Sequence, residues 1–117
     1  MFQFLQDSAI VSFLAALLLF LVLDGVWFAL STVYPAMPHL RVGRVVRGGG
    51  VAWAALAFAH VTLVRSPWEG FLFGLLSYSV FNGTEYAINN NWSGKTAMYD
   101  TMWGTFTNTL VATVLAA

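Results

Sequence analysis

Residues 8–33 read SAIVSFLAALLLFLVLDGVWFALSTV, and Asp24 alone interrupts this uncharged, largely apolar run. About 20 apolar residues suffice for a helix to cross the hydrocarbon core of a bilayer, so this segment is long enough to span it with some tilt. A carboxylate at mid-bilayer costs about 2.5–3.5 kcal/mol on insertion scales. We therefore expect Asp24 to face the protein interior and to have a hydrogen-bonding partner there.

The composition of the whole chain also indicates a membrane protein. Of its 117 residues, 59% are hydrophobic and only 9% are charged, and the mean hydropathy is +0.74. Soluble domains carry roughly 25% charged residues, so a soluble fold could not cover its surface with so few. The net charge of zero gives no basic footprint for nucleic acid. The absence of cysteine excludes disulfides and thiolate metal sites.

The apolar runs are separated by short connections rich in proline, glycine and asparagine, which interrupt helices. Sustained alternation of apolar and polar residues, which membrane strands require, is missing. The sequence therefore predicts an all-α integral membrane protein, with four antiparallel transmembrane helices in one bundle and a single domain over residues 1–117. The expected helices cover about 8–33, 48–64, 68–88 and 96–116.

The distribution of basic residues predicts an orientation. The expected connection 35–47 holds Arg41, Arg44 and Arg47, and the connection between the last two helices holds Lys95, whereas the opposite side has Arg65 next to Glu69. Basic loops remain on the cytoplasmic side. We expect both of these loops there (or on the stromal or matrix side), with both termini opposite. Tyr34, Trp68 and Trp92 lie near the expected boundaries, as residues of an aromatic belt do.

The pattern Asp-x-x-Trp occurs twice, as Asp24/Trp27 and as Asp100/Trp103. A spacing of three puts both side chains of a pair on one helix face. Because the first and last helices are antiparallel, the two motifs point in opposite directions. A carboxylate only accepts hydrogen bonds and an indole nitrogen only donates them, so two cross-motif bonds are possible, from Trp103 to Asp24 and from Trp27 to Asp100. We expect at least one of them.

A polar stripe follows the third helix, in which Tyr78, Asn82, Glu85 and Asn89 recur at helical spacing. Together with the two motifs it predicts an intramembrane polar cluster in the cytoplasmic half of the membrane. The predicted members are Asp24, Trp27, Tyr78, Asn82, Glu85, Asp100 and Trp103. Such a cluster has a structural interpretation, in which polar groups lock helix register. Its functional interpretation is a proton or solute site.

Three further residues have specific predictions. Gly70 and Gly74 form a small-xxx-small motif, which permits close helix packing. His60 lies in the second apolar run. A lone intramembrane histidine most often bonds to a neighbouring helix, and ligation of chlorophyll or haem is the alternative. No other cofactor and no metal site is indicated.

The motifs resemble a known family. Leu23, Asp24 and Trp27 match its first element, and Trp92 followed by Asp100, Trp103, Gly104 and Thr105 matches its last. This is the pattern of the membrane-protein family called domain of unknown function 2177. The resemblance implies a four-helix membrane protein and no particular activity. Where the family pattern has Asp and Asn, this chain has Asn82 and Glu85.

The sequence predicts the first of the following three functions, with the second and the third as alternatives. The first is a non-catalytic structural or accessory subunit of a larger assembly, respiratory or photosynthetic in type, with membrane-protein partners or further copies of itself. The second is a small oligomeric transporter that uses the intramembrane acids to carry protons or a solute. The third is a membrane enzyme acting on lipid, although no nucleophile–base pair or metal-ligand spacing stands beside the acids. A water-filled path to the acids favours transport, a lipid-sized cleft favours the enzyme, and neither favours the subunit.

Overall fold

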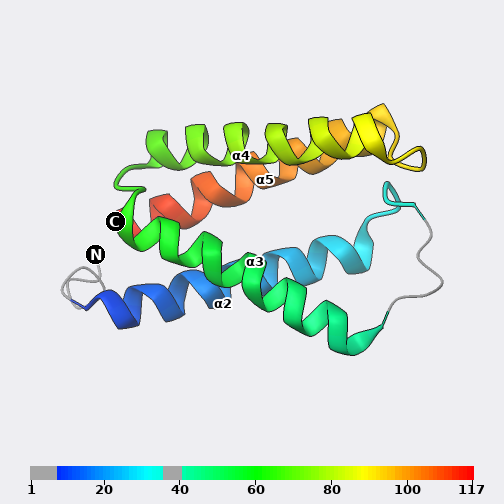
Figure 1. Cartoon of the computed structure of the whole chain (residues 1–117). Helices are drawn as coiled ribbons and strands as arrows, with labels where there is room; N and C mark the ends of the chain where they lie inside the picture. The colour runs from blue at the N-terminus through cyan, green and yellow to red at the C-terminus, as the bar shows by residue number, and fades with distance from the viewer. Residues whose placement is uncertain (1–7, 36–40) are drawn as a thin grey trace.

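The computed structural model describes residues 8–35 and 41–117, and these residues form four helices and no strand. The helices are α2 (Ala9–Leu30), α3 (Val42–Thr62), α4 (Pro67–Ile88) and α5 (Gly94–Ala116). Successive helices run in opposite directions, and the start of α2 lies at the same end as the end of α5 (Figure 1). The all-α prediction is therefore confirmed. Residues 36–40 of the expected first connection, Pro38 among them, lie outside the described residues.

Serine begins three of the helices through the same local interaction. The side chain of Ser8 accepts a hydrogen bond from the backbone of Val11 in α2, Ser66 caps α4, and Ser93 caps α5. Each satisfies a backbone N–H that lacks an intrahelical acceptor. Pro67 follows Ser66 at the first helical position, where its fixed φ suits the helix.

The start of α3 differs from the prediction. The helix begins at Val42 rather than near Gly48, so Arg44 and Arg47 lie on its first turns and not in a loop. Arginine is a favourable helix former, and the glycines at 48–50 do not stop the helix because no residue there imposes a turn. The apolar run thus marks only the inner part of α3.

Close packing is concentrated between α4 and α5. A Cβ atom on Gly70 would lie 2.6 Å from the backbone oxygen of Asn108, and one on Gly74 would lie 2.7 Å from that of Gly104. Gly104 in turn lies directly against the ring of Tyr78. Gly70 and Gly74 therefore lie where the sequence expects a helix contact, because only glycine permits this approach.

The other helices are joined less closely. α2 crosses α3 and also contacts α5. The N-terminal half of α3 diverges from α4 (Figure 1). A small apolar core holds the crossing together through Ala16 and Phe20 of α2, Ala57 of α3 and Val111 of α5. Residues of α3 and α4, together with some of α2 and α5, line a cavity that holds the candidate site.

Two of the predicted spans have the length and hydropathy to cross a membrane, α2 (Ala9–Leu30) and α3 (Val42–Thr62). Both are about 30 Å long at 1.5 Å per residue. α4 and α5 are of similar length but contain more polar residues, including Asn82, Asp100 and Asn108.

Candidate functional site

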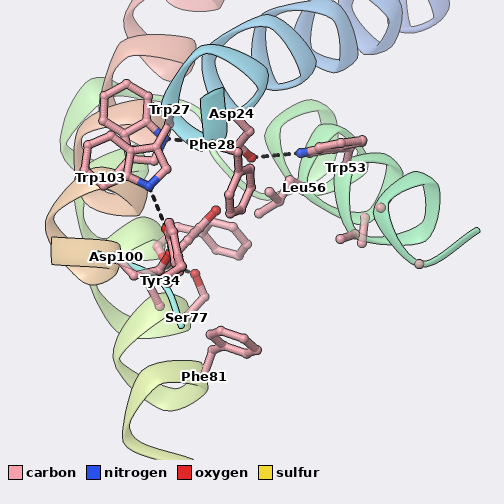
Figure 2. Close-up of a pocket in the computed structure, with 16 residues that line it drawn as sticks. Asp24, Trp27, Phe28, Tyr34, Trp53, Leu56, Ser77, Phe81, Asp100 and Trp103 are labelled. Atoms are coloured by element: carbon pink, nitrogen blue, oxygen red, sulfur yellow. Dashed lines mark hydrogen bonds between the residues drawn. The ribbon is translucent and has the colours of Figure 1, made fainter. Parts of the chain in front are cut away.

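Asp24, on the inward face of α2, is 7% exposed. One carboxylate oxygen accepts from Trp53 Nε1 of α3 at 2.8 Å, and the other accepts from Trp103 Nε1 of α5 at 3.0 Å. Figure 2 shows the Trp53 side chain of α3 with its indole nitrogen directed at this carboxylate. The bond from Trp103 is one of the two possible cross-motif bonds, at least one of which the sequence predicts.

Asp100 of α5 is likewise 7% exposed and has a different pair of donors. Asn82 Nδ2 of α4 donates to one oxygen at 2.7 Å, and the Tyr34 hydroxyl donates to the other. Trp27 does not reach Asp100 directly; its Nε1 donates to the Tyr34 hydroxyl at 2.6 Å. The second of the two possible cross-motif bonds is thus not direct, and Tyr34 connects Trp27 to Asp100.

The stacking of the two motif tryptophans accompanies this indirect connection between Trp27 and Asp100. The rings of Trp27 and Trp103 stack with centroids 4.7 Å apart and an interplanar angle of 8°. Offset stacking is a favourable arrangement for aromatic rings. In this stack Trp103 bonds to Asp24 and Trp27 bonds to Tyr34.

Tyr34 follows the end of α2, and the sequence places it only in an aromatic belt. The connection carries it back into the bundle, where the hydroxyl of Thr96 also donates to the backbone oxygen of Val33. Burial, together with the hydrogen bond to Asp100, raises the pKa of Tyr34 above its ordinary value of 10.0. The phenol therefore stays protonated and keeps its role as a donor. No helical periodicity could reveal this, because the residue lies outside a helix.

Trp92 completes the network around Asp100. Its Nε1 donates to Asn82 Oδ1 at 2.9 Å, while Asn82 Nδ2 donates both to Asp100 and to the backbone oxygen of Tyr78. Trp92 therefore orients the amide that holds the carboxylate. Within residues 8–35 and 41–117, the partners of both aspartates are neutral donors and no ion pair compensates either of them.

A cavity of about 540 Å³ borders both carboxylates between α3 and α4. Its wall is mainly apolar and aromatic, and its described lining residues include no lysine or arginine. Tyr78 lines it, and its hydroxyl makes no hydrogen bond to any described residue. Figure 2 shows Phe28, Ser77 and Phe81 around the same space. The lining consists of Asp24, Trp27, Phe28, Tyr34, Gly48, Gly49, Ala52, Trp53, Ala55, Leu56, Phe73, Ser77, Tyr78, Phe81, Asp100 and Trp103.

Glu85 does not join the other predicted members of the polar cluster. Glu85 lies one turn beyond Asn82 on α4 and does not line the cavity. Its carboxylate accepts a hydrogen bond from Asn89 Nδ2 at 3.2 Å. The helical stripe places Glu85 on a similar face, but α4 has by then passed the level of Asp100. Among the described residues, no three acidic, histidine or cysteine side chains come close enough to hold a metal ion.

His60 lies apart from the cavity, in a buried contact between α3 and α5. Its Nε2 is 2.7 Å from Asn108 Oδ1. Asn108 Nδ2 donates to the backbone oxygen of Gly104, so Oδ1 is the acceptor and Nε2 carries the proton. The ring packs edge-on against Phe20 and Phe73. Its Nδ1 is buried without a partner among the described residues. His60 thus makes the interhelical bond that is the simpler of its two predicted roles.

A protein-family model with the description "Predicted membrane protein (DUF2177)" matches residues 45–117, which is more than half of the chain. The match contains the Asp100/Trp103 motif, Asn82 and Trp92, and leaves Asp24 outside. No curated protein and no solved structure matches the chain.

Proposed function

The chain belongs to the DUF2177 family of predicted membrane proteins, and on this premise we propose that it is a small multi-pass carrier that binds a solute in the cavity beside Asp24 and Asp100. The cavity itself is the observation that carries this proposal. Its volume of about 540 Å³ lies within the range of small-molecule sites, roughly 300–1,000 Å³. Asp24 lies six residues from the end of α2, which puts it about 9 Å inside that end.

The proposal requires that all four helices span the bilayer, and the surfaces of α4 and α5 support this. Val80 of α4 is 71% exposed and Met102 of α5 is 59% exposed, as expected of side chains that contact lipid. The hydroxyls of Thr84 and Thr113, on the same two helices, donate to backbone oxygens of their own helix at 2.7 Å. Their polar groups are thus satisfied without water, as lipid requires.

The orientation that we propose keeps the basic end of the bundle in the cytoplasm. Arg41 precedes α3 and Lys95 lies in the first turn of α5; these two helices begin at the same end (Figure 1). Arg65 lies at the other end, where its backbone N–H donates to the Glu69 carboxylate at 2.9 Å. This asymmetry favours a cytoplasmic position for the first end, and the cavity then lies nearer the cytoplasm.

The competing functions make different demands on this site. An accessory subunit needs its polar groups satisfied but has no use for an aromatic cavity beside them. A lipid enzyme needs a nucleophile activated by a base near the acids; the lining holds the hydroxyl of Ser77, which donates to the backbone oxygen of Phe73 at 2.6 Å and not to a carboxylate. A carrier needs a cavity that reaches polar groups inside the helix bundle, and the cavity beside Asp24 and Asp100 supports this function.

Water access to the cavity from each side of the membrane tests the proposal. The chain lacks cysteine, so Ser77→Cys introduces a single thiol into the cavity wall, and Leu76→Cys places a matched thiol on the exposed surface of the same helix. A membrane-impermeant thiol reagent is applied to oriented vesicles from either side. A carrier predicts labelling of Ser77→Cys from both sides and none of Leu76→Cys. Labelling from one side only contradicts transport, and no labelling supports the accessory subunit.

A further inference from the structure

Both carboxylates in the cavity wall are held by neutral hydrogen-bond donors. Trp53 and Trp103 each donate one bond to Asp24, at 2.8 and 3.0 Å, and Asn82 and Tyr34 do the same for Asp100. Indole, amide and phenol donors satisfy lone pairs of an ionised carboxylate but do not neutralise it. Each carboxylate oxygen retains accepting capacity and has only neutral partners, so an ionised carboxylate here lacks a counter-charge that a cation in the cavity would supply.

The remaining lining excludes two kinds of ligand. Anions meet two acidic side chains and no lysine or arginine among the described lining residues. Small metal ions require several oxygen ligands, and no group of three suitable side chains exists in the described part of the chain. An inorganic cation would also lose hydration against a wall made mostly of hydrocarbon and aromatic rings.

The aromatic side chains supply the complementary half of the site. The stacked pair Trp27 and Trp103, together with Trp53 and Tyr78, borders the same cavity as the two carboxylates. Ring faces attract cations, most strongly for tryptophan, and the effect increases when the cation is desolvated. The small residues Gly49 and Ala52 on the α3 side leave room for an apolar body.

We propose that the solute is a hydrophobic organic ammonium ion, whose positive charge lies between Asp24 and Asp100 and whose apolar body occupies the aromatic cavity between α3 and α4. This inference rests on the proposed carrier function and names its substrate class. The hydrogen bonds from Trp53 and Trp103 to Asp24, and from Asn82 and Tyr34 to Asp100, hold both carboxylates in place before the solute arrives. Preorganisation of this kind reduces the entropic cost of binding.

A pair of probes that differ only in charge tests the substrate class. Benzyltrimethylammonium and its neutral carbon isostere, neopentylbenzene, have nearly the same shape, and phenylacetate serves as an anion of comparable size. Binding of each to the whole chain in detergent is measured by isothermal titration calorimetry, supported by the fluorescence of the cavity tryptophans. We expect the cation to bind about tenfold or more tightly than its isostere, which corresponds to one unit on a logarithmic affinity scale, and the anion not to bind.

Variants locate the effect in the cavity. Asp24→Asn removes a charge while its amide oxygen still accepts from an indole, and should weaken binding of the cation about tenfold without changing binding of the isostere. Glu85→Gln removes a charge outside the cavity and should change neither. If Asp24→Asn does not fold, the comparison of the probes on the unaltered chain still decides the question.

The outcomes separate this inference from the proposed function. Equal affinity for the cation and the isostere, or an unchanged affinity in Asp24→Asn, overturns the ammonium class. If Ser77→Cys is nevertheless labelled from both sides, the carrier function stands with a different solute. If no probe binds and Ser77→Cys is not labelled, both proposals are wrong.

Discussion

The contact between α4 and α5 can be tested by adding one methyl group at Gly74. A Cβ atom at this position would lie 2.7 Å from the backbone oxygen of Gly104, 2.8 Å from Asn108 Cβ and 2.9 Å from Thr105 Cα. None of these atoms can move away by rotation of a flexible side chain. Gly74→Ala therefore forces the backbones of α4 and α5 apart, and overpacking of this kind costs about 1–3 kcal/mol.

A second effect has the opposite sign. Alanine is about 1 kcal/mol more favourable than glycine inside a helix, so at Gly74 this gain offsets part of the cost of overpacking. Gly83, on the same helix, provides the control, since nothing lies within 4 Å of its added Cβ. Gly83→Ala receives only the gain in helix propensity. The free energy of unfolding of Gly74→Ala should thus be lower than that of Gly83→Ala by about 1–3 kcal/mol.

The measurement is unfolding of the detergent-solubilised protein by increasing sodium dodecyl sulfate, followed by circular dichroism. Both variants and the unaltered chain are compared under the same conditions. Gly74→Leu, with a larger side chain, should be less stable still. Equal stability of Gly74→Ala and Gly83→Ala would refute the close packing of α4 on α5.

Three further predictions concern the acids and the orientation. Burial and the bond to Asp100 raise the pKa of Tyr34, so the contribution of Tyr34 to stability is complete below about pH 10 and declines as the pH rises towards the raised pKa. Tyr34→Phe should remove this decline when the free energy of unfolding is measured between pH 8 and 12. An unchanged pH profile in Tyr34→Phe would contradict this prediction. If Asp24 is structural, Asp24→Asn should be more stable than Asp24→Leu, because only the amide still accepts from the indole of Trp103. If the protein is a proton-coupled carrier, both variants should abolish flux in proteoliposomes. Gly43→Cys, near the start of α3, should react with an impermeant thiol reagent from the cytoplasmic side only, and labelling from outside would reverse the proposed orientation.

The helices and their antiparallel order follow from the sequence because each apolar run is interrupted by residues that end helices. Ser66 and Ser93 are a further signal that could have placed the starts of α4 and α5, since a serine before a helical run caps the backbone. The start of α3 could not be predicted from the apolar run, because apolarity does not report helicity. The arginines that precede the apolar part are good helix formers and extend the helix.

The site was predictable only where both partners lie on helices. Asp24 and Trp103 could be matched because their depths follow from helical rise and antiparallel order. Tyr34 could not, because its position depends on the path of a connection. Trp53 was also missed as a donor to Asp24, since the crossing of α2 and α3 is set by side-chain packing in three dimensions. The cavity arises from that same crossing and leaves no local signal in the sequence.

The hydrogen bonds of the two aspartates divide evenly between the halves of the chain. Asp24 receives one donor from its own helical hairpin and one from the other, and Asp100 does the same through Asn82 and Tyr34. The α2–α3 and α4–α5 hairpins therefore recognise each other as two subunits of a heterodimer do. Severed between α3 and α4 and produced together, they should reassociate in the membrane. A hairpin produced alone would leave its carboxylate with one of its two donors missing.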